Sequence, residues 1–324
     1  MKSFSYVTPQ TPESAVALVS DEGRFLAGGM DLLGEMKERL VEPAVLVNIK
    51  ALPGTREIAA APEVWRIGAN VTLAELAAHP GLRRQFPAIA QAAEEVGSPQ
   101  MRNVATLGGN LAQHSRCWYY RHRDARCRKK GGPNCFARRD QNKYHALFTG
   151  CMCVSPAVSN LAMALAALDA RVRLLRGRKA TTLTIAELYA SAWRTPAAHN
   201  SLAPEDLILG IDLPVAAGQR SVYLQVAEKS DFDWALVSCA AAARVEGKTL
   251  RDARIVLGAV APIPWTVDAA NRLLDGQEWS DELAGRVAET LLRDATPLAH
   301  NGYKVPIAHA LVRRALARLV AEDP

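Results

Sequence analysis

The sequence lacks a hydrophobic run long enough to cross a membrane. Hydrophobic residues make up 49% of its 324 positions, but stretches such as LVSCAAAARV are short, whereas a membrane-spanning helix needs about 20 apolar residues. The opening MKSFSYVTPQTPESAVALVS also lacks the continuous apolar core and small-residue cleavage site of a signal peptide. We therefore expect a cytoplasmic protein with no membrane segment, with export on a partner's signal as the alternative.

Several cofactor-binding signatures are also missing. No two cysteines have the C-x2-4-C spacing of a structural zinc knuckle. No run has the plant-type C-x4-C-x2-C spacing of [2Fe–2S] clusters, and we recognise no molybdopterin site. No stretch fits G-x-G-x-x-G or the Walker pattern, which excludes a Rossmann dinucleotide-binding domain and a P-loop NTPase.

What the sequence does have is a concentration of cysteine. Five of the six cysteines fall within 37 residues, at positions 117, 127, 135, 151 and 153. In a cytoplasmic protein such a group is more often a set of metal ligands or redox groups than disulfides. The wide spacing suits an iron–sulfur cluster, but on spacing alone zinc and unligated thiols stay open. Cys239 lies in an apolar, strand-like run and is expected to be a buried small side chain.

The same segment carries the excess positive charge of the chain. Between Arg116 and Lys143 there are ten Lys or Arg against two Asp, while the other 29 basic and 31 acidic residues leave the remainder at −2. A basic run is usually a solvated surface. Base stacking on Trp118, Tyr119 and Tyr120 would instead indicate nucleic-acid binding. We expect no nucleic acid, because these aromatics directly follow a cysteine and are better placed to shield a metal site.

Hydrophobic periodicity predicts an α+β protein. Residues 25–29 and 44–50 have the pattern of buried strands, 83–98 that of a helix, and Thr72 with Glu75 that of a capping box. Beyond about residue 176, strand-like stretches at short intervals predict an antiparallel sheet, closed by two helices. The expected division is a two-part N-terminal α/β domain over 1–176 (1–55 and 56–176) with a loop insertion at about 114–154, then an α+β domain over 177–324.

Two glycine-containing loops point to a bound phosphate. AGGMDLLGEMK (27–37) and NVATLGGNLA (103–112) each place paired glycines where a strand gives way to a polar turn. Backbone amides in such loops can approach a pyrophosphate without obstruction by Cβ atoms. Taken singly, each pair is more typical of an ordinary tight turn.

Together the loops resemble the FAD-binding (medium) subunit of the molybdenum hydroxylases, the xanthine dehydrogenase and carbon monoxide dehydrogenase family. There FAD lies between two loops written roughly A-G-G-x-D/S-L-L and T-x-G-G-N, which here are AGGMDLL and TLGGN. SPAVSNLAMALAALDA, DLILGIDLP and NGYKVPIAHALVRRAL resemble later motifs of the same family. The resemblance implies a PCMH-type FAD-binding domain followed by a domain like the C-terminal one of the carbon monoxide dehydrogenase flavoprotein.

The resemblance also implies the FAD contacts. The two loops would wrap the pyrophosphate and ribityl chain, and Val96 and Leu209 would form apolar walls. Met30 stands where the family often has a hydrogen-bonding side chain, Asn160 replaces an aspartate, and Leu224 replaces a lysine near the flavin in relatives close to xanthine dehydrogenase. In full, the implied cofactor residues are Ala27, Gly28, Gly29, Met30, Asp31, Leu32, Leu33, Val96, Thr106, Leu107, Gly108, Gly109, Asn110, Asn160, Leu209 and Leu224.

The cysteine segment resembles an insertion found in a minority of these subunits. In the 4-hydroxybenzoyl-CoA reductase and bacterial aldehyde oxidase types, four cysteines of this insertion ligate a [4Fe–4S] cluster. Matched to that pattern, the ligands are Cys117, Cys127, Cys135 and Cys153, with Cys151 as the alternative for the fourth place. His114, His122 and His145 are expected to be surface or capping residues, with ligation as the less common alternative.

The resemblance implies an electron-transfer subunit of a multi-subunit molybdenum hydroxylase, without catalytic acid–base or nucleophilic residues of its own. Its partners would be a large molybdopterin subunit and a small [2Fe–2S] subunit in a dimer of heterotrimers. An external carrier such as a ferredoxin would be attracted by the basic segment. Two other interpretations are a nucleotide-binding regulatory or scaffold protein with a zinc-stabilised basic loop, and a free-standing flavin oxidase.

Overall fold

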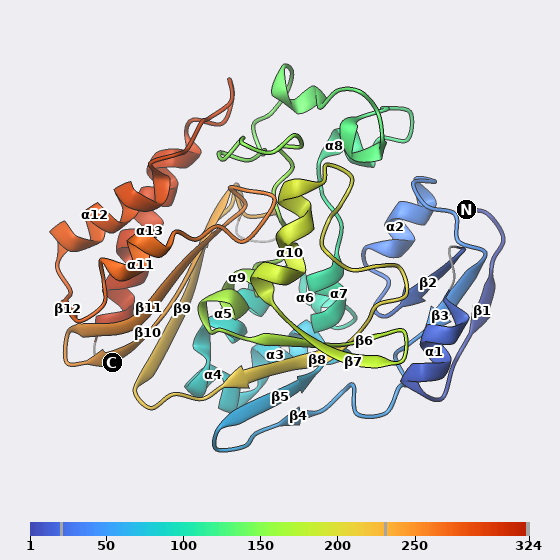
Figure 1. Ribbon diagram of the computed structural model, residues 1–324, viewed down its shortest axis with the longest axis horizontal. Helices are drawn as coiled ribbons and strands as arrows, with labels where there is room; N and C mark the ends of the chain where they lie inside the picture. Colours follow the sequence, from blue (N-terminus) through green and yellow to red (C-terminus); the bar gives the residue numbers. More distant parts are fainter. Residues whose placement is uncertain (20–21, 230–231, 322–324) are drawn as a thin grey trace.

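The computed structural model describes residues 1–19, 22–229 and 232–321. Three β-sheets follow one another along the longest axis of the molecule, with the N-terminal sheet at one end and the C-terminal sheet at the other (Figure 1). Within the described ranges, every helix is too short or too polar to span a bilayer. The predicted α+β class is confirmed by this arrangement of sheets.

The first sheet is small and parallel. Its strands are β1 (Ser5–Val7), β3 (Val45–Asn48) and β2 (Gly23–Leu26), in that spatial order. Helices α1 (Pro12–Leu18) and α2 (Leu32–Lys37) supply the crossovers that parallel strands need. Helix α1 starts where the Thr11 hydroxyl accepts from Ser14 N–H and Pro12 takes the first helical position. Strand β2 runs directly into the first glycine loop, so the sheet fixes that loop in place.

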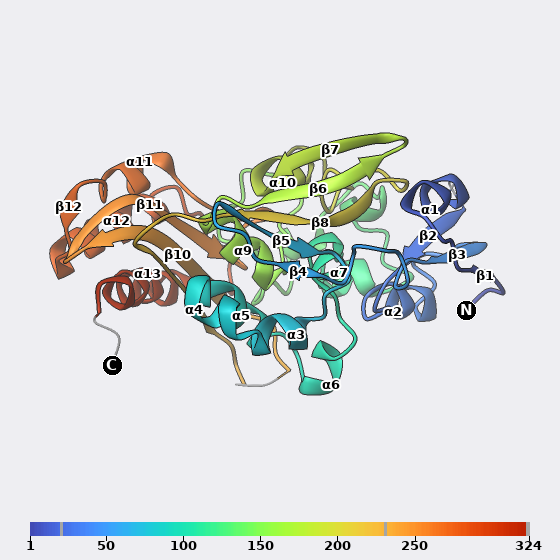
Figure 2. The same ribbon diagram turned by 90° about the horizontal axis from the view of Figure 1, so that it is seen from below.

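The second sheet is central and antiparallel. Its order is β4 (Ile58–Ala59), β5 (Val64–Gly68), β8 (Leu207–Pro214), β6 (Arg171–Arg176) and β7 (Lys179–Thr184). Its core is completed by helices α3 (Leu73–Ala78), α4 (Pro80–Gln85), α5 (Pro87–Glu94), α7 (Leu107–Ala112), α9 (Asn160–Ala167) and α10 (Ile185–Arg194). Helix α6 (Pro99–Arg102) has no buried residue. Figure 2 shows α3, α4 and α5 below this sheet.

Two details of this region differ from expectation. The helix expected over 83–98 is two helices, α4 and α5, because Pro87 begins the second one and cannot donate to the turn before it. The division expected at residue 176 falls inside the sheet, because β7 pairs with β6 and β8 pairs with both β5 and β6. The chain leaves this sheet only after Pro214, between β8 and β9.

The third sheet is the expected C-terminal antiparallel one. Its order is β12 (Gln277–Glu278), β11 (Thr249–Gly258), β10 (Val237–Glu246) and β9 (Gln219–Val226). Helices α11 (Asp268–Arg272), α12 (Asp281–Leu292) and α13 (Lys304–Val320) accompany it, and α12 and α13 bury their apolar faces in its core. Cys239 is fully buried in that core, as expected.

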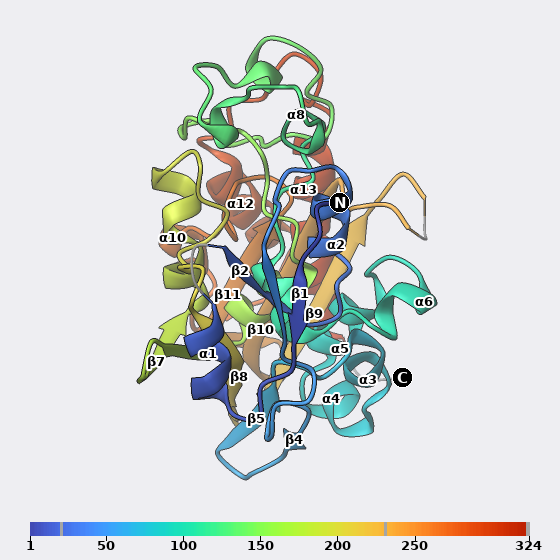
Figure 3. The ribbon, with the colours of Figure 1, turned by 90° about the vertical axis from the view of Figure 1, so that its right-hand side faces the viewer.

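The insertion crosses the top of the molecule as a loop-rich segment with short helical turns, α8 (Trp118–Arg121), η1 (Arg128–Lys130) and η2 (Phe136–Arg138) (Figures 1 and 3). Its far end is anchored in the C-terminal core, where Phe148 stacks on Trp265 with ring centroids 3.7 Å apart. The insertion therefore spans from the second glycine loop to the C-terminal domain.

Candidate cofactor sites

A cavity of about 370 Å³ lies between the two glycine loops and the approach to β8. Predicted residues from both loops line it, which confirms that the fold brings loops about 75 residues apart in sequence to one place. Eleven of the sixteen implied residues are in its lining: Ala27, Gly28, Gly29, Met30, Asp31, Leu32, Val96, Thr106, Gly108, Gly109 and Asn110.

The first loop offers a row of main-chain donors to this cavity. The N–H groups of residues 28–32 make no hydrogen bond within the described part of the chain, while Leu33 N–H already donates to Gly29 O at 3.1 Å. The Asp31 side chain does not cap helix α2, although Asp31 occupies the N-cap position. Five consecutive unpaired amides at the start of a helix form the kind of concave donor set that binds phosphate oxygens.

The second loop uses its amides internally. Leu107 N–H donates to Val71 O at 2.9 Å, Gly108 N–H to Ala69 O at 2.8 Å, and Gly109 N–H to the Thr106 hydroxyl at 3.2 Å. This loop therefore contributes shape and side chains to the cavity rather than free amides, contrary to the equal roles suggested by the two glycine pairs.

Close packing between the loops explains Gly28. A Cβ atom on Gly28 would lie 2.0 Å from Val104 O and 3.1 Å from Ala105 Cα, at the start of the second loop. Gly29 has φ +74°, in the left-handed region that favours glycine. The first glycine thus allows the loops to touch, and the second turns the chain toward α2.

Five implied residues lie outside the cavity lining. Leu33 packs beside the small apolar cluster under α2, Leu107 is a fully buried core residue, and Leu209 packs beside the N-terminal core. Leu224 packs against the C-terminal core, and Asn160 lines a neighbouring cavity instead. Strand β8 still borders the main cavity, through Leu207 and Ile208 in place of Leu209. Leu32 therefore lines the cavity, whereas Leu33 and Leu107 of the same two motifs pack into apolar clusters. The motifs alone do not show which leucine faces the cavity.

Sequence reasoning missed other lining residues. Asn70 follows β5, is 3% exposed and donates to Ile49 O at 2.6 Å and to the Thr55 hydroxyl at 2.9 Å. Its Oδ1 is buried and has no hydrogen-bond partner in the described part. Asn70 thus lines the cavity while its unpartnered oxygen is covered by neighbouring atoms. A polar residue directly after a buried strand was the only sequence signal available for it.

A second cavity of about 360 Å³ adjoins the first. Arg116 and Trp234 line both cavities, with the Arg116 guanidinium 4.7 Å from the centre of the Trp234 ring. The second cavity extends toward the insertion through Cys117 and Trp118, and Asn160 lies in its wall with Nδ2 3.2 Å from Gln225 Oε1. The two cavities thus lie side by side between the glycine loops and the cysteine segment.

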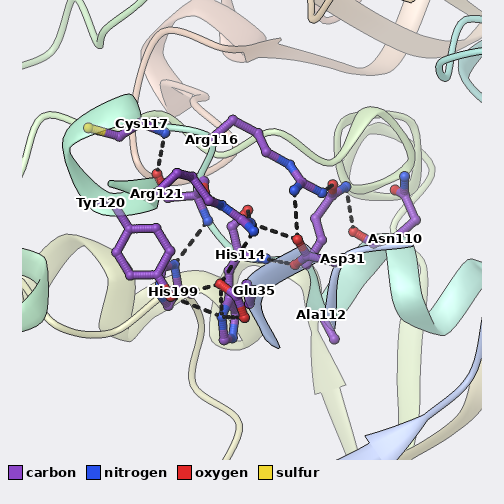
Figure 4. A network of polar contacts seen from close by, with 12 residues as sticks. Asp31, Glu35, Asn110, Ala112, His114, Arg116, Cys117, Tyr120, Arg121 and His199 are labelled. Carbon is purple, nitrogen blue, oxygen red and sulfur yellow. Dashed lines mark hydrogen bonds and ion pairs between the residues drawn. The ribbon is translucent and has the colours of Figure 1, made fainter. Parts of the chain in front are cut away.

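A charged network joins the first loop to the insertion (Figure 4). Asp31 lies 2.6 Å from both Arg116 and Arg121, and Glu35, 2% exposed, accepts from the Tyr120 hydroxyl at 2.8 Å and lies 3.0 Å from His114. Burial alone would raise the pKa of Asp31, but the two arginines outweigh it and hold that pKa below its usual range. The Asp31 carboxylate is therefore held in ion pairs with two arginines of the insertion.

Asp31, Glu35 and His114 also place their ligand atoms within 4.8 Å of one another, as a metal site would. Two guanidinium groups already neutralise this cluster, since Arg116 contacts Asp31 and Arg121 contacts both carboxylates. The arrangement is better explained as an ion-pair network than as a metal site.

Four thiols meet in the insertion. Cys117, Cys127, Cys135 and Cys153 line one small cavity of about 10 Å³, and these are the four predicted ligands. Cys151 is absent from this lining, and its thiol donates to Cys153 O at 3.0 Å. Burial raises the pKa of Cys117 to about 11, whereas a hydrogen bond from Cys153 lowers that of Cys135 to about 6.

The four thiols do not form a preformed tetrahedral zinc site in the described part of the chain. Four sulfurs at 2.3 Å from zinc would lie about 3.8 Å apart. Among the described residues, no three cysteines bring their sulfurs within 4.8 Å of one another. The cavity is nevertheless small, so a cluster would have to separate the Cys135 and Cys153 sulfurs, which hydrogen-bond each other.

Comparison with known proteins decides the family. Residues 2–216 match the family model described as the FAD binding domain in molybdopterin dehydrogenase, and residues 222–319 match that of the CO dehydrogenase flavoprotein C-terminal domain. The chain belongs to the FAD-binding medium subunits of the molybdenum hydroxylase family. Like other members of this family, it is an oxidoreductase subunit with an FAD-binding domain.

Individual relatives agree with this membership. The chain is 33% identical over 327 residues to the aldehyde oxidoreductase FAD-binding subunit PaoB of Escherichia coli (strain K12), covering 99% of this chain and 98% of that one. It is 27% identical to the carbon monoxide dehydrogenase medium chain of Hydrogenophaga pseudoflava, covering 97% and 96%. The solved structure of carbon monoxide dehydrogenase from that organism superposes with a TM-score of 0.76 at 25% identity, over 98% of this chain and 96% of that one.

Proposed function

We propose that this medium subunit transfers electrons between an external redox partner, a [4Fe–4S] cluster in its insertion, its FAD, and the [2Fe–2S] clusters of a partner subunit. The single observation that carries the proposal is the convergence of four predicted cysteines on one cavity, next to the second of two adjoining cavities, the first of which is lined by the glycine loops.

The glycine-loop cavity suits FAD. The amides of residues 28–32, which have no partner among the described residues, would hold the pyrophosphate. Asn160 and Trp234 in the adjoining cavity would border the flavin ring. Flavin, when bound, exchanges one or two electrons, and this chain's residues bind it, orient it and exclude water. No residue is assigned an acid–base or nucleophilic role.

The donor set of the insertion suits an iron–sulfur cluster better than zinc. Four thiols form the usual ligand set of such a cluster, and no three of them are gathered as a single tetrahedral ion would require in the described part of the chain. Lys129, 7% exposed, and the surrounding arginines would offset the negative charge of a thiolate-bound cluster. Cys117, Cys127, Cys135 and Cys153 would hold the cluster, which would supply one-electron transfer.

The proposed partners follow from family membership and charge. We propose a large molybdopterin subunit and a small [2Fe–2S] subunit, assembled as a dimer of heterotrimers, in the cytoplasm. Arg123, Arg126 and Arg139 are exposed on the insertion, and would attract an acidic carrier such as a ferredoxin. The substrate chemistry would take place on the large subunit.

Two cysteine variants test the cluster. Cys135→Ser should remove most of the iron and acid-labile sulfide from anaerobically purified protein while FAD stays bound. Cys151→Ser is the matched control, because Cys151 lies outside the thiol cavity, and it should keep both. Iron loss in Cys151→Ser but not in Cys153→Ser would overturn the ligand assignment. A colourless protein containing zinc would favour the regulatory or scaffold alternative.

A further inference from the structure

His145 occupies a position that none of the roles above uses. It is 2% exposed and lies in the insertion, where its Nε2 is 3.1 Å from Cys117 Sγ. Cys117 and His145 are the two residues that line both the thiol cavity and the adjoining second cavity. This histidine is therefore at the boundary between the two proposed cofactor sites.

The fold holds the backbone and the ring of His145 in place from several sides. The His145 N–H donates to Asn142 O at 2.9 Å, and its carbonyl accepts from Asn301 Nδ2 at 3.1 Å and Lys304 Nζ at 3.0 Å. Its ring meets Trp118 edge-on, with centroids 5.2 Å apart and an interplanar angle of 77°. The buried Lys304 belongs to α13, so the C-terminal domain fixes where His145 stands.

The hydrogen-bond inventory sets the direction of the contact. In the proposed cluster the Cys117 sulfur would be a thiolate that only accepts, so His145 Nε2 would be the donor in this contact. His145 Nδ1 is buried and has no partner among the described residues, which fits a neutral ring with its proton on Nε2. The contact with Cys117 is then the one hydrogen bond that the described structure gives to this ring.

We propose that His145 is a positioning residue that donates a hydrogen bond from Nε2 to the Cys117 sulfur and raises the reduction potential of the proposed cluster. The inference rests on the proposed [4Fe–4S] site. Hydrogen bonds to ligating sulfurs withdraw charge from a cluster and favour its reduced form. Because Cys117 borders the second cavity, the same contact also fixes the thiolate that faces the flavin side.

An EPR-monitored redox titration of the purified complex tests this role. His145→Phe keeps a ring against Trp118 but removes the donor, whereas His145→Gln keeps an N–H donor. At a fixed potential the ratio of reduced to oxidised cluster should fall about tenfold in His145→Phe, equivalent to about 59 mV for one electron. His145→Gln should recover most of the difference. His122→Gln, at an exposed histidine of the same segment with no side-chain hydrogen bond in the described part, should match the unaltered protein.

The outcomes separate the two levels of the proposal. An unchanged potential in His145→Phe, with full iron content, would overturn the role of His145 and leave the cluster in place. Absence of a cluster signal and of sulfide in the unaltered complex would remove the cluster itself. Loss of iron from both variants with FAD retained would also overturn the tuning role, since the ring would then be needed to form the site.

Discussion

At the scale of single residues, the two glycine loops have different tasks. Among the described residues, the N–H groups of residues 28–32 in the first loop have no hydrogen-bond partner, whereas in the second loop Leu107 and Gly108 N–H donate to Val71 O and Ala69 O. At Gly28, Val104 O occupies the space that a side chain would need. The Gly-Gly pair therefore meets different physical requirements in the two loops. The sequence motif alone does not show which requirement applies to which loop.

This distinction predicts opposite effects on stability when Gly28 and Gly34 are each replaced by alanine. Gly28→Ala should destabilise the protein by roughly 1–3 kcal/mol and lower FAD content, because its methyl group would overlap Val104 O. Gly34→Ala is the control, since a Cβ there meets nothing within 4 Å and alanine favours the helix by up to about 1 kcal/mol. Thermal unfolding and bound flavin would be measured together. Equal behaviour of the two variants would contradict the loop contact.

At the scale of elements, helix α2 is tied to the insertion by buried charge. Asp31 and Glu35 extend from the loop and helix, and Arg116, Arg121 and Tyr120 extend from the insertion and α8. The glycine-loop cavity and the cysteine segment are therefore parts of one polar framework, so that movement of one element costs contacts in the other. The family motif contains Asp31, but its partners lie in a segment that most relatives are expected to lack.

The network predicts a pH dependence of stability. Because the folded-state pKa of Asp31 lies below its unfolded value of about 3.9, its contribution is complete above pH 5 and is lost as the pH falls through the folded value. In urea titrations, Asp31→Asn should cost roughly 3 kcal/mol at pH 7 and less at pH 3.

Asp124→Asn is the matched control for this experiment. Asp124 is an exposed carboxylate of the same insertion and has no ion pair within the described ranges. Its substitution should leave the stability unchanged at both pH values. A cost of Asp31→Asn that stays constant between pH 3 and pH 7 would contradict the assignment of the ion pairs.

At the scale of the whole molecule, the sequence predicts the fold class, the joining of the two loops and the four cysteines of one cavity. It does not predict the pairing of β7 and β8 with β6, because strand order depends on long-range contacts. Nor does it predict Asn70, Trp234 or the use of Asp31 by arginines about 85–90 residues away. Local patterns identify what each segment is, whereas tertiary packing decides which side chains of a motif reach a cavity.

The uneven charge distribution predicts a salt-sensitive encounter with an acidic carrier. Replacing Arg123 and Arg126 by Glu reverses both charges. It should slow association with a ferredoxin-type protein several-fold at low ionic strength, with little difference at high salt. Arg286→Glu, on the exposed side of α12, is the control of equal charge change per site. Stopped-flow reduction at several salt concentrations would measure the rates, and equal slowing by Arg286→Glu would argue against docking at the insertion.

The central claim is that one chain holds both a flavin and a four-thiolate iron–sulfur cluster. The most direct test is the cofactor content of the complex, purified without oxygen, together with its visible spectrum before and after reduction. The account predicts one FAD and about four iron and four acid-labile sulfide per medium subunit, beyond those of a [2Fe–2S] partner. Flavin without this additional iron and sulfide would contradict it.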